Sequence, residues 1–319
     1  MIAIPGLPCR SARPLAIGLV ALGLSAAPAA GGSPLARDTA CRAETRAELP
    51  VTVQRNFLLV PAALDGGRTL MLVDTGAEAS TVTPEAARTL GLAWQRTGRT
   101  IVGVGGTVQG GSVRVRHMDL GPLRHVALTL DVGSLPSLGG RGRPVAGLLG
   151  ADVLDAYDIE IDVPGQAMRL HAVSPCPGFI PPGYRSGNGH PLSRTRSGLL
   201  FLSVEVEGRR MRALLDTGAR GSLITPRAAS QAGVTEAALA RDPVVTGRGL
   251  GGARLAFRQH RFNEVRVGAS VARDMVMSIA PLPLEGVDML LGADWLAGRR
   301  IWISRAANRL FQERGDTPR

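Results

Sequence analysis

Lysine is absent from this sequence, so all of its basic side chains other than histidine are arginines. The chain has 319 residues and a formal net charge of +11. Its arginines are scattered, without the basic runs and interleaved aromatics that nucleic-acid surfaces use. We therefore expect no nucleic acid among the partners of this protein.

Aromatic residues make up only 3% of the chain, which leaves an aliphatic core of leucine, valine, isoleucine and alanine. The five histidines show no metal-binding spacing such as HExxH, and no GxSxG motif indicates a serine hydrolase. A GxGxxG run at Gly247–Gly252 precedes an expected strand, whereas a dinucleotide loop needs a helix there. We therefore expect no metal and no cofactor.

Long apolar runs are also missing, except near the N-terminus. Arg10 and Arg13 precede an apolar stretch over Leu15–Ala27, and Ala27-Pro28-Ala29 offers the small residues of a cleavage site. This pattern predicts a signal peptide over residues 1–30 and a periplasmic or secreted protein. The alternative is an uncleaved segment that anchors the protein to the membrane.

Cysteine is scarce, with only Cys9, Cys41 and Cys176. Cys9 would leave with the signal peptide, so two thiols would remain in an oxidising compartment. A disulfide between Cys41 and Cys176 and a pair of free thiols are both open expectations, because the sequence does not decide between them.

The sequence does contain one pattern twice. MLVDTGAEASTVTPEAARTLG begins at Met71, and ALLDTGARGSLITPRAASQAG begins at Ala213, 142 residues later. At the same offset, VAGLLGADVL from Val145 matches VDMLLGADWL from Val287. A shared register over this length indicates a duplication. Two copies are too few for a solenoid, so we expect a two-lobed, pseudo-symmetric molecule.

Each copy is predicted to consist mostly of strands. A short apolar run precedes each Asp-Thr-Gly, whose glycine permits a tight turn. Thr83 and Thr225 are expected N-caps of short helices that begin with proline. Gly91 and Gly233 are expected to end those helices.

We predict four segments from these patterns: the signal peptide at 1–30, an N-terminal lobe at 45–172, a linker at 173–197 and a C-terminal lobe at 198–314. The linker is dense in proline, glycine and serine, a composition that predicts neither helix nor strand.

The repeated motif resembles that of the retropepsin-like aspartic proteases. The resemblance rests on DTGA after an apolar strand, a glycine-rich segment and Leu-Leu-Gly before a short helix, and it extends over about residues 50–311. Retroviral members assemble two identical chains, whereas this chain carries both copies and is similar to a single-chain bacterial member. The resemblance implies a mostly β fold of two pseudo-symmetric retropepsin-like β-barrel lobes. It also implies a monomer with an intramolecular pseudo-dimer.

Asp74 and Asp216 are the expected catalytic residues. Two carboxyls that share one proton can divide the work of peptide hydrolysis: the ionised one accepts a proton from water, and the protonated one donates to the scissile carbonyl oxygen. One carboxylate cannot fill both roles, which explains why the motif would occur twice. The pair titrates as a unit, so neither role is assigned to either residue.

Other roles around this pair follow from the resemblance. Thr75 and Thr217 are expected to cross-bond between the lobes, and Gly76 and Gly218 to give backbone amides room near the carboxylates. Substrate is expected to contact the residues after each motif and two flap tips that close over it: Ala77, Glu78, Ala219, Arg220, Gly105, Gly106, Gly251 and Gly252.

We therefore expect an exported aspartic endopeptidase with protein or peptide substrates. A non-catalytic peptide-binding module of the same fold is one alternative, and a β-rich envelope structural protein is another. Activity retained after Asp74→Asn would exclude the endopeptidase, and peptide binding without turnover would favour the binding module.

Overall fold

The computed structural model describes residues 41–103, 106–135, 145–174, 178–185, 187, 189–248 and 254–313. All of them belong to one unit, Cys41–Arg319. The predicted signal peptide lies outside the described residues. In the described ranges no helix is long and apolar enough to cross a membrane.

The N-terminal lobe is an eight-stranded sheet. Its strands in spatial order are β2 (Thr52–Gln54), β3 (Phe57–Leu64), β4 (Gly67–Val73), β9 (Val145–Leu149), β5 (Thr81–Val82), β8 (Leu123–Val132), β7 (Gly106–Leu120) and β6 (Trp94–Gly103). An additional pairing between β3 and β7 curls the sheet into a barrel. The apolar runs recognised in the sequence form its inner strands.

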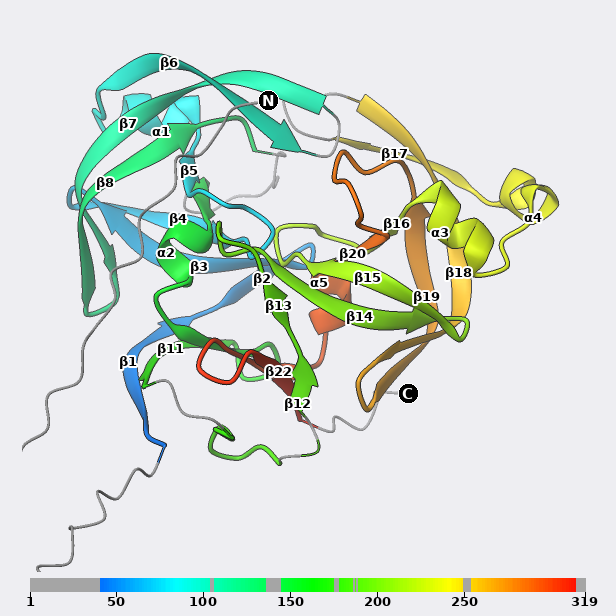
Figure 1. Ribbon diagram of the computed structural model, residues 1–319. Coiled ribbons are helices and arrows are strands. Elements are labelled where there is room, and N and C mark those ends of the chain that lie inside the picture. The colour runs from blue at the N-terminus through cyan, green and yellow to red at the C-terminus, as the bar shows by residue number, and fades with distance from the viewer. Residues whose placement is uncertain are drawn as a thin grey trace, which may run out of the picture. The chain divides into compact units, whose positions relative to one another are not determined.

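The C-terminal lobe repeats this sheet strand for strand. Its order is β13 (Ser193–Arg194), β14 (Leu200–Val206), β15 (Arg209–Leu215), β20 (Met289–Leu291), β16 (Leu223–Ile224), β19 (Ser270–Ile279), β18 (Arg254–Val267) and β17 (Val244–Arg248). Here β14 pairs additionally with β18, as β3 pairs with β7. In Figure 1 the strands of the N-terminal lobe run from blue to green, and those of the C-terminal lobe run from yellow-green to orange. The predicted mostly β, two-lobed fold is therefore confirmed.

Five short helices accompany the strands in the ranges that the structure describes. They are α1 (Pro84–Thr89), α2 (Ala151–Leu154), α3 (Pro226–Gln231), α4 (Glu236–Arg241) and α5 (Ala293–Leu296). The hydroxyls of Thr83 and Thr225 accept hydrogen bonds from the amides three residues on, at 3.0 and 3.2 Å, as expected of N-caps. Gly91 and Gly233 follow α1 and α3 with φ of 65° and 93°. These left-handed conformations favour glycine, so the predicted helix ends are confirmed.

A third, six-stranded sheet joins the two halves of the chain. Its order is β1 (Ala43–Pro50), β11 (Ala167–Val173), β10 (Asp158–Asp162), β21 (Arg300–Ser304), β22 (Arg309–Gln312) and β12 (Gly189–Pro191). The junction is the antiparallel pair β10–β21, where Ile159 pairs with Ile303 and Ile161 with Ile301. These four isoleucines belong to the main apolar core. Neither half of the chain can complete this sheet alone.

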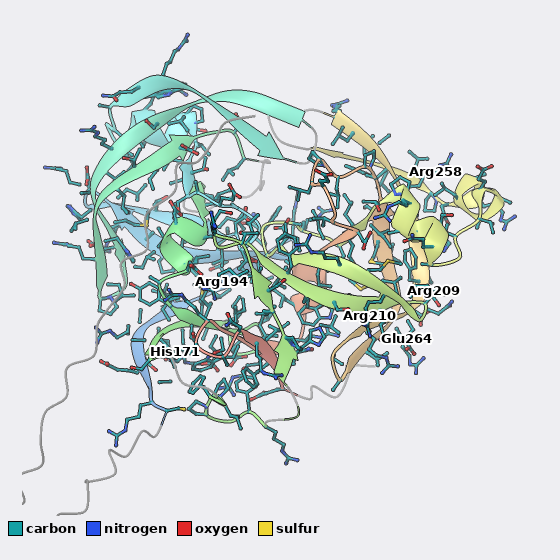
Figure 2. All side chains as sticks on the ribbon, viewed as in Figure 1. His171, Arg194, Arg209, Arg210, Arg258 and Glu264 are labelled. Carbon is teal, nitrogen blue, oxygen red and sulfur yellow. The ribbon has the colours of Figure 1, made fainter. Side chains whose placement is uncertain are left out.

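The other face of this sheet is covered by part of the predicted linker. His171 of β11 stacks on Trp302 with ring centroids 4.0 Å apart, and Figure 2 labels His171 close to β1 and β11. Phe179 and Tyr184 pack against Trp302 and Phe311 in a separate apolar cluster. The proline-rich segment therefore contributes a small core of its own.

The expectation that residues 173–197 contain no strand was wrong. Strands β12 and β13 lie within them, paired with β22 and β14. Strand β12 has three residues and pairs with the distant β22, and β13 has only two residues, so no local pattern reveals either of them. Cys41 is disulfide-bonded. Cys176 lies outside the described residues, and its pairing with Cys41 stays a prediction.

Candidate active site

Each Asp-Thr-Gly turn is fixed to a strand of its own lobe. Strand β4 ends just before Asp74, whose amide donates to the Leu149 carbonyl at 3.0 Å. Strand β15 ends just before Asp216, whose amide donates to the Leu291 carbonyl, also at 3.0 Å. The two turns therefore have the same backbone support, as the repeated sequence predicts.

The threonines of the two turns bond across the lobes. Thr75 Oγ1 donates to the Leu215 carbonyl at 2.7 Å and accepts from the Thr217 amide at 3.2 Å. Thr217 Oγ1 donates to the Val73 carbonyl at 2.7 Å and accepts from the Thr75 amide at 3.1 Å. Both side chains are buried. Because each hydroxyl satisfies groups of the opposite turn, neither turn can shift without the other.

The glycines of the two turns lie against the opposite carboxyls. A Cβ added to Gly76 would lie 2.4 Å from Asp216 Cγ, and one added to Gly218 would lie 2.2 Å from Asp74 Cγ. Real Cβ atoms do not approach so closely, so any side chain there would displace a carboxyl. The glycines therefore let the two aspartates meet.

The meeting of the two carboxyls changes their proton affinities. Asp74 Oδ1 accepts from the Gly76 amide and Asp216 Oδ1 from the Ala219 amide, each at 3.0 Å. Burial and the adjacent negative charge of Asp216 raise the pKa of Asp74 well above its usual value. Burial also raises the pKa of Asp216, against the opposing effect of hydrogen bonds from backbone amides. A pair of this kind retains one shared proton at a pH where isolated carboxyls are ionised.

A second pair of polar contacts supports the turns, between residues for which the sequence predicted no role. Ser80 Oγ donates to Asp152 Oδ1 at 2.6 Å, and Ser222 Oγ donates to Asp294 Oδ1 at 2.7 Å. Each serine also accepts from the glycine amide before α2 or α5, at 2.9 Å. These contacts tie each turn's exit to the Leu-Leu-Gly-Ala-Asp segment. Their sequence signal was the repetition of both serine and aspartate at the same offset.

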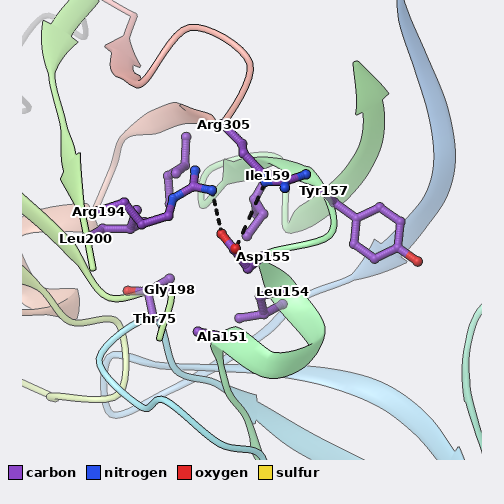
Figure 3. Close-up of a pocket in the computed structure, with 11 residues that line it drawn as sticks. Thr75, Ala151, Leu154, Asp155, Tyr157, Ile159, Arg194, Gly198, Leu200 and Arg305 are labelled. Carbon is purple, nitrogen blue, oxygen red and sulfur yellow. Dashed lines mark ion pairs between the residues drawn. The ribbon is translucent and has the colours of Figure 1, made fainter. Parts of the chain in front are cut away.

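A small cavity lies beneath the threonine contacts and is lined partly by Thr75. Figure 3 shows Arg194 and Arg305 reaching Asp155 beside it, and the Arg194–Asp155 ion pair measures 2.7 Å. The cavity has about 20 Å³, enough for roughly one water molecule. It is too small for a peptide, so a peptide would have to approach the carboxyls elsewhere. Both aspartates keep an intermediate solvent exposure that permits this.

The expected substrate residues next to the turns are found around the carboxyls. Ala77 and Ala219 directly follow the two turns and are partly buried. Glu78 and Arg220 come next, and both are exposed. Ser197 Oγ donates to Glu78 Oε1 at 2.6 Å. One residue of each lobe therefore presents a charge to solvent just beyond the dyad.

The expected flap tips are described only in part. Gly106 pairs with Gly103 at the end of the β6–β7 hairpin and has a φ of 126°. Gly105, Gly251 and Gly252 lie outside the described residues, so their contact with substrate stays a prediction. Within the described part of the chain, no group of three histidine, cysteine, aspartate or glutamate side chains could hold a metal ion.

Comparison with known proteins gives several similarities. A family model described as aspartyl protease matches twice, over residues 60–153 and 202–295. The chain is 30% identical over 120 residues to DNA damage-inducible protein 1 of Neurospora crassa, an alignment that covers 38% of this chain. It covers only 26% of the fungal protein, so this chain spans about a quarter of that relative's length.

Two solved structures are also similar. A retropepsin-like aspartic protease from Rickettsia conorii has 19% identity and a TM-score of 0.30, covering 42% of this chain and 96% of its own. An aspartic proteinase from Irpex lacteus has 16% identity and a TM-score of 0.47, covering 85% of this chain and 97% of its own. The two matches to the family model each contain one Asp-Thr-Gly turn and together span more than half of the sequence, so this chain belongs to the aspartyl protease family.

Proposed function

We propose that this protein is an aspartic endopeptidase that hydrolyses peptide bonds with a water molecule activated by Asp74 and Asp216. The observation that carries the proposal is the opposed placement of the two carboxyls, each against the glycine of the other turn. The raised pKa values of the pair support it, because the reaction needs one protonated and one ionised carboxyl.

The proposed reaction follows from the shared proton. A water between the carboxyls loses a proton to the ionised one as its oxygen attacks the scissile carbonyl carbon. The protonated carboxyl donates its proton to the carbonyl oxygen, which gives a neutral tetrahedral diol. Return of the proton from that oxygen and protonation of the amide nitrogen break the carbon–nitrogen bond. The carboxyls exchange roles during the cycle, so the pair ends in its starting protonation state.

We also propose that the protein works outside the cytoplasm, in the periplasm or after secretion, as a monomer. The N-terminal sequence pattern supports export, with a membrane anchor as the alternative if that segment is not cleaved. The disulfide of Cys41 supports an oxidising compartment. The two Asp-Thr-Gly turns within one chain support a monomer, because no second copy is needed to supply a carboxyl.

The test is hydrolysis of a peptide library at several pH values by the wild type, Asp216→Asn and a matched control, Asp274→Asn. Asp274 is exposed and has a φ of 54°, a conformation that asparagine tolerates. We expect turnover by the wild type and the control, and a loss of at least about a thousandfold in Asp216→Asn. Turnover that survives in Asp216→Asn would overturn the proposal. Binding without turnover in the wild type would favour the peptide-binding module instead.

A further inference from the structure

The internal symmetry places two unlike charges on opposite sides of the dyad. Glu78 and Arg220 each follow an aspartate of the dyad by four residues, in turns with the same backbone hydrogen bonds. The pseudo-twofold axis passes between Asp74 and Asp216, since the turns exchange the same contacts. Equivalent residues therefore emerge on opposite sides of it, and both side chains are exposed.

A turn from the opposite lobe reaches each of these residues. Ser197 Oγ donates to the Glu78 carboxylate at 2.6 Å, and Thr195 Oγ1 lies 2.9 Å from the same serine hydroxyl. On the other side, Asn56 Nδ2 donates to the backbone carbonyl of Arg220 at 3.3 Å. The turn at Ser197 therefore binds the side chain of Glu78. The turn at Asn56 binds only the backbone of Arg220, so it does not hold the Arg220 guanidinium.

The charge balance differs between the two sides. Arg55 belongs to the turn that reaches Arg220, and neither arginine has an acidic partner among the residues that the structure describes. Glu78 has a hydroxyl partner and, within the same described set, no ion pair, even though Arg196 is adjacent to Ser197 in sequence. One end of the site is therefore anionic and the other is cationic.

We propose that Glu78 and Arg220 read opposite charges on the two sides of the cut, in a peptide that lies across the dyad in one direction. Two equivalent lobes could not distinguish the two charge orders, so a preference needs a group that differs between them. Here the substrates would be peptides with a basic residue on the Glu78 side of the cut and an acidic residue on the Arg220 side. The inference rests on the proposed endopeptidase function, because it concerns the same site.

The test uses two peptides of identical composition around one cleavable apolar core. One carries arginine before and aspartate after the cut, at equal distances from it, and the other carries them in reverse. The enzymes are the wild type, the double swap Glu78→Arg with Arg220→Glu, and the control Arg210→Gln. Arg210 is an exposed arginine near the end of the β14–β15 hairpin, where Figure 2 shows it beside Arg209. The readout is the ratio of kcat/KM for the two peptides.

We expect the wild type and Arg210→Gln to favour one charge order by about tenfold, and the swapped enzyme to favour the other. The preference should shrink at 1 M salt, where exposed charges are screened. A ratio near one in the wild type, or an unchanged preference in the swapped enzyme, would overturn the inference.

Binding to the Asp74→Asn variant separates this inference from the proposed function. Fluorescence anisotropy with labelled forms of both peptides requires no turnover. An order preference in binding, reversed when the swap is added, would support the charge-reading role even if no enzyme cleaves either peptide. In that event the endopeptidase proposal alone would fail. Equal affinity for both orders, or no binding of either peptide, would overturn the charge-reading role.

Discussion

The two lobes agree closely at the floor of the site and differ around it. The bonds of Thr75 are repeated by Thr217, and those of Ser80 are repeated by Ser222. Away from the floor, the C-terminal lobe has helix α4 between α3 and its flap strands, where the N-terminal lobe passes from α1 to β6. A shared proton requires equivalent surroundings for two carboxyls, whereas recognition of a directional peptide does not. The two lobes therefore need to be equivalent only within a few residues of the dyad.

A further contrast lies on the sheet beside each turn. In the C-terminal lobe the Arg212 guanidinium lies over the Phe201 ring, 4.1 Å from its centroid. The equivalent residues of the N-terminal lobe are Leu70 and Leu59, which belong to or pack against an aliphatic cluster. The same backbone therefore carries a cation–π contact in one lobe and plain apolar packing in the other.

The largest expected effect tests whether the two halves of the dyad are equivalent. Asp74→Asn and Asp216→Asn should each reduce kcat by at least about a thousandfold, and the double variant should be little worse than either single one. The reason is that asparagine is nearly isosteric but cannot carry the shared proton. Single-turnover hydrolysis with circular dichroism as a folding control measures this. Losses that multiply in the double variant would contradict a carboxyl pair acting as one unit.

The threonine cross-bonds give the next largest effect. Thr75→Ala or Thr217→Ala should each lower the free energy of unfolding by about 1–3 kcal/mol, because buried groups of the opposite turn lose their partner. Thr→Ser keeps the hydroxyl and should recover most of the loss. Urea denaturation of both alanine variants provides the comparison. A large loss of unfolding free energy for one threonine and none for the other would show that the two cross-bonds do not stabilise the protein equally.

A smaller effect concerns pH. Ala77 and Ala219 directly follow the two Asp-Thr-Gly triplets, so neither position offers a hydroxyl to the carboxyls. Both amides lie close to carboxyls whose pKa values are raised, so we expect activity at mildly acidic to near-neutral pH. A serine at either position would donate to the ionised carboxylate and lower its pKa.

The acid limb of the kcat/KM profile should then move to lower pH by up to about 1 unit in Ala77→Ser or Ala219→Ser. The direction follows because the carboxylate would stay ionised in more acidic solution. Ala→Gly at the same positions is the control, since it adds no donor. A shift to higher pH, or a wild-type optimum near pH 2, would contradict this explanation.

The parts that the sequence predicted are those with a repeated or local signal. The aspartates, threonines and glycines of the turns recur in register, and the N-caps Thr83 and Thr225 have a local pattern. The Ser80–Asp152 contact also recurs at the same offset, but a serine and an aspartate 72 residues apart do not indicate contact by themselves. Only folding of the intervening strands brings them together.

The six-stranded sheet could not be predicted in this way. Its junction pairs β10 with β21, and its edge pairs β12 with β22, so the register depends on contacts between distant segments. The linker's Phe179 and Tyr184 read as isolated aromatics in a proline-rich stretch. They form a buried cluster with Trp302 and Phe311, which lie more than a hundred residues later in the sequence.

The shared sheet also has a consequence for the order of events during biosynthesis. Strand β22 ends at Gln312, so a ribosome must translate the chain as far as this strand before the sheet can close. The Asp216 turn likewise emerges long after the Asp74 turn, and each threonine depends on the other for its hydrogen bonds. A nascent chain therefore carries only half of a site until the Asp216 turn has been made. Such a protease would be unable to attack neighbouring nascent proteins, or its own unfinished copies, before the second turn and strand β22 had been made.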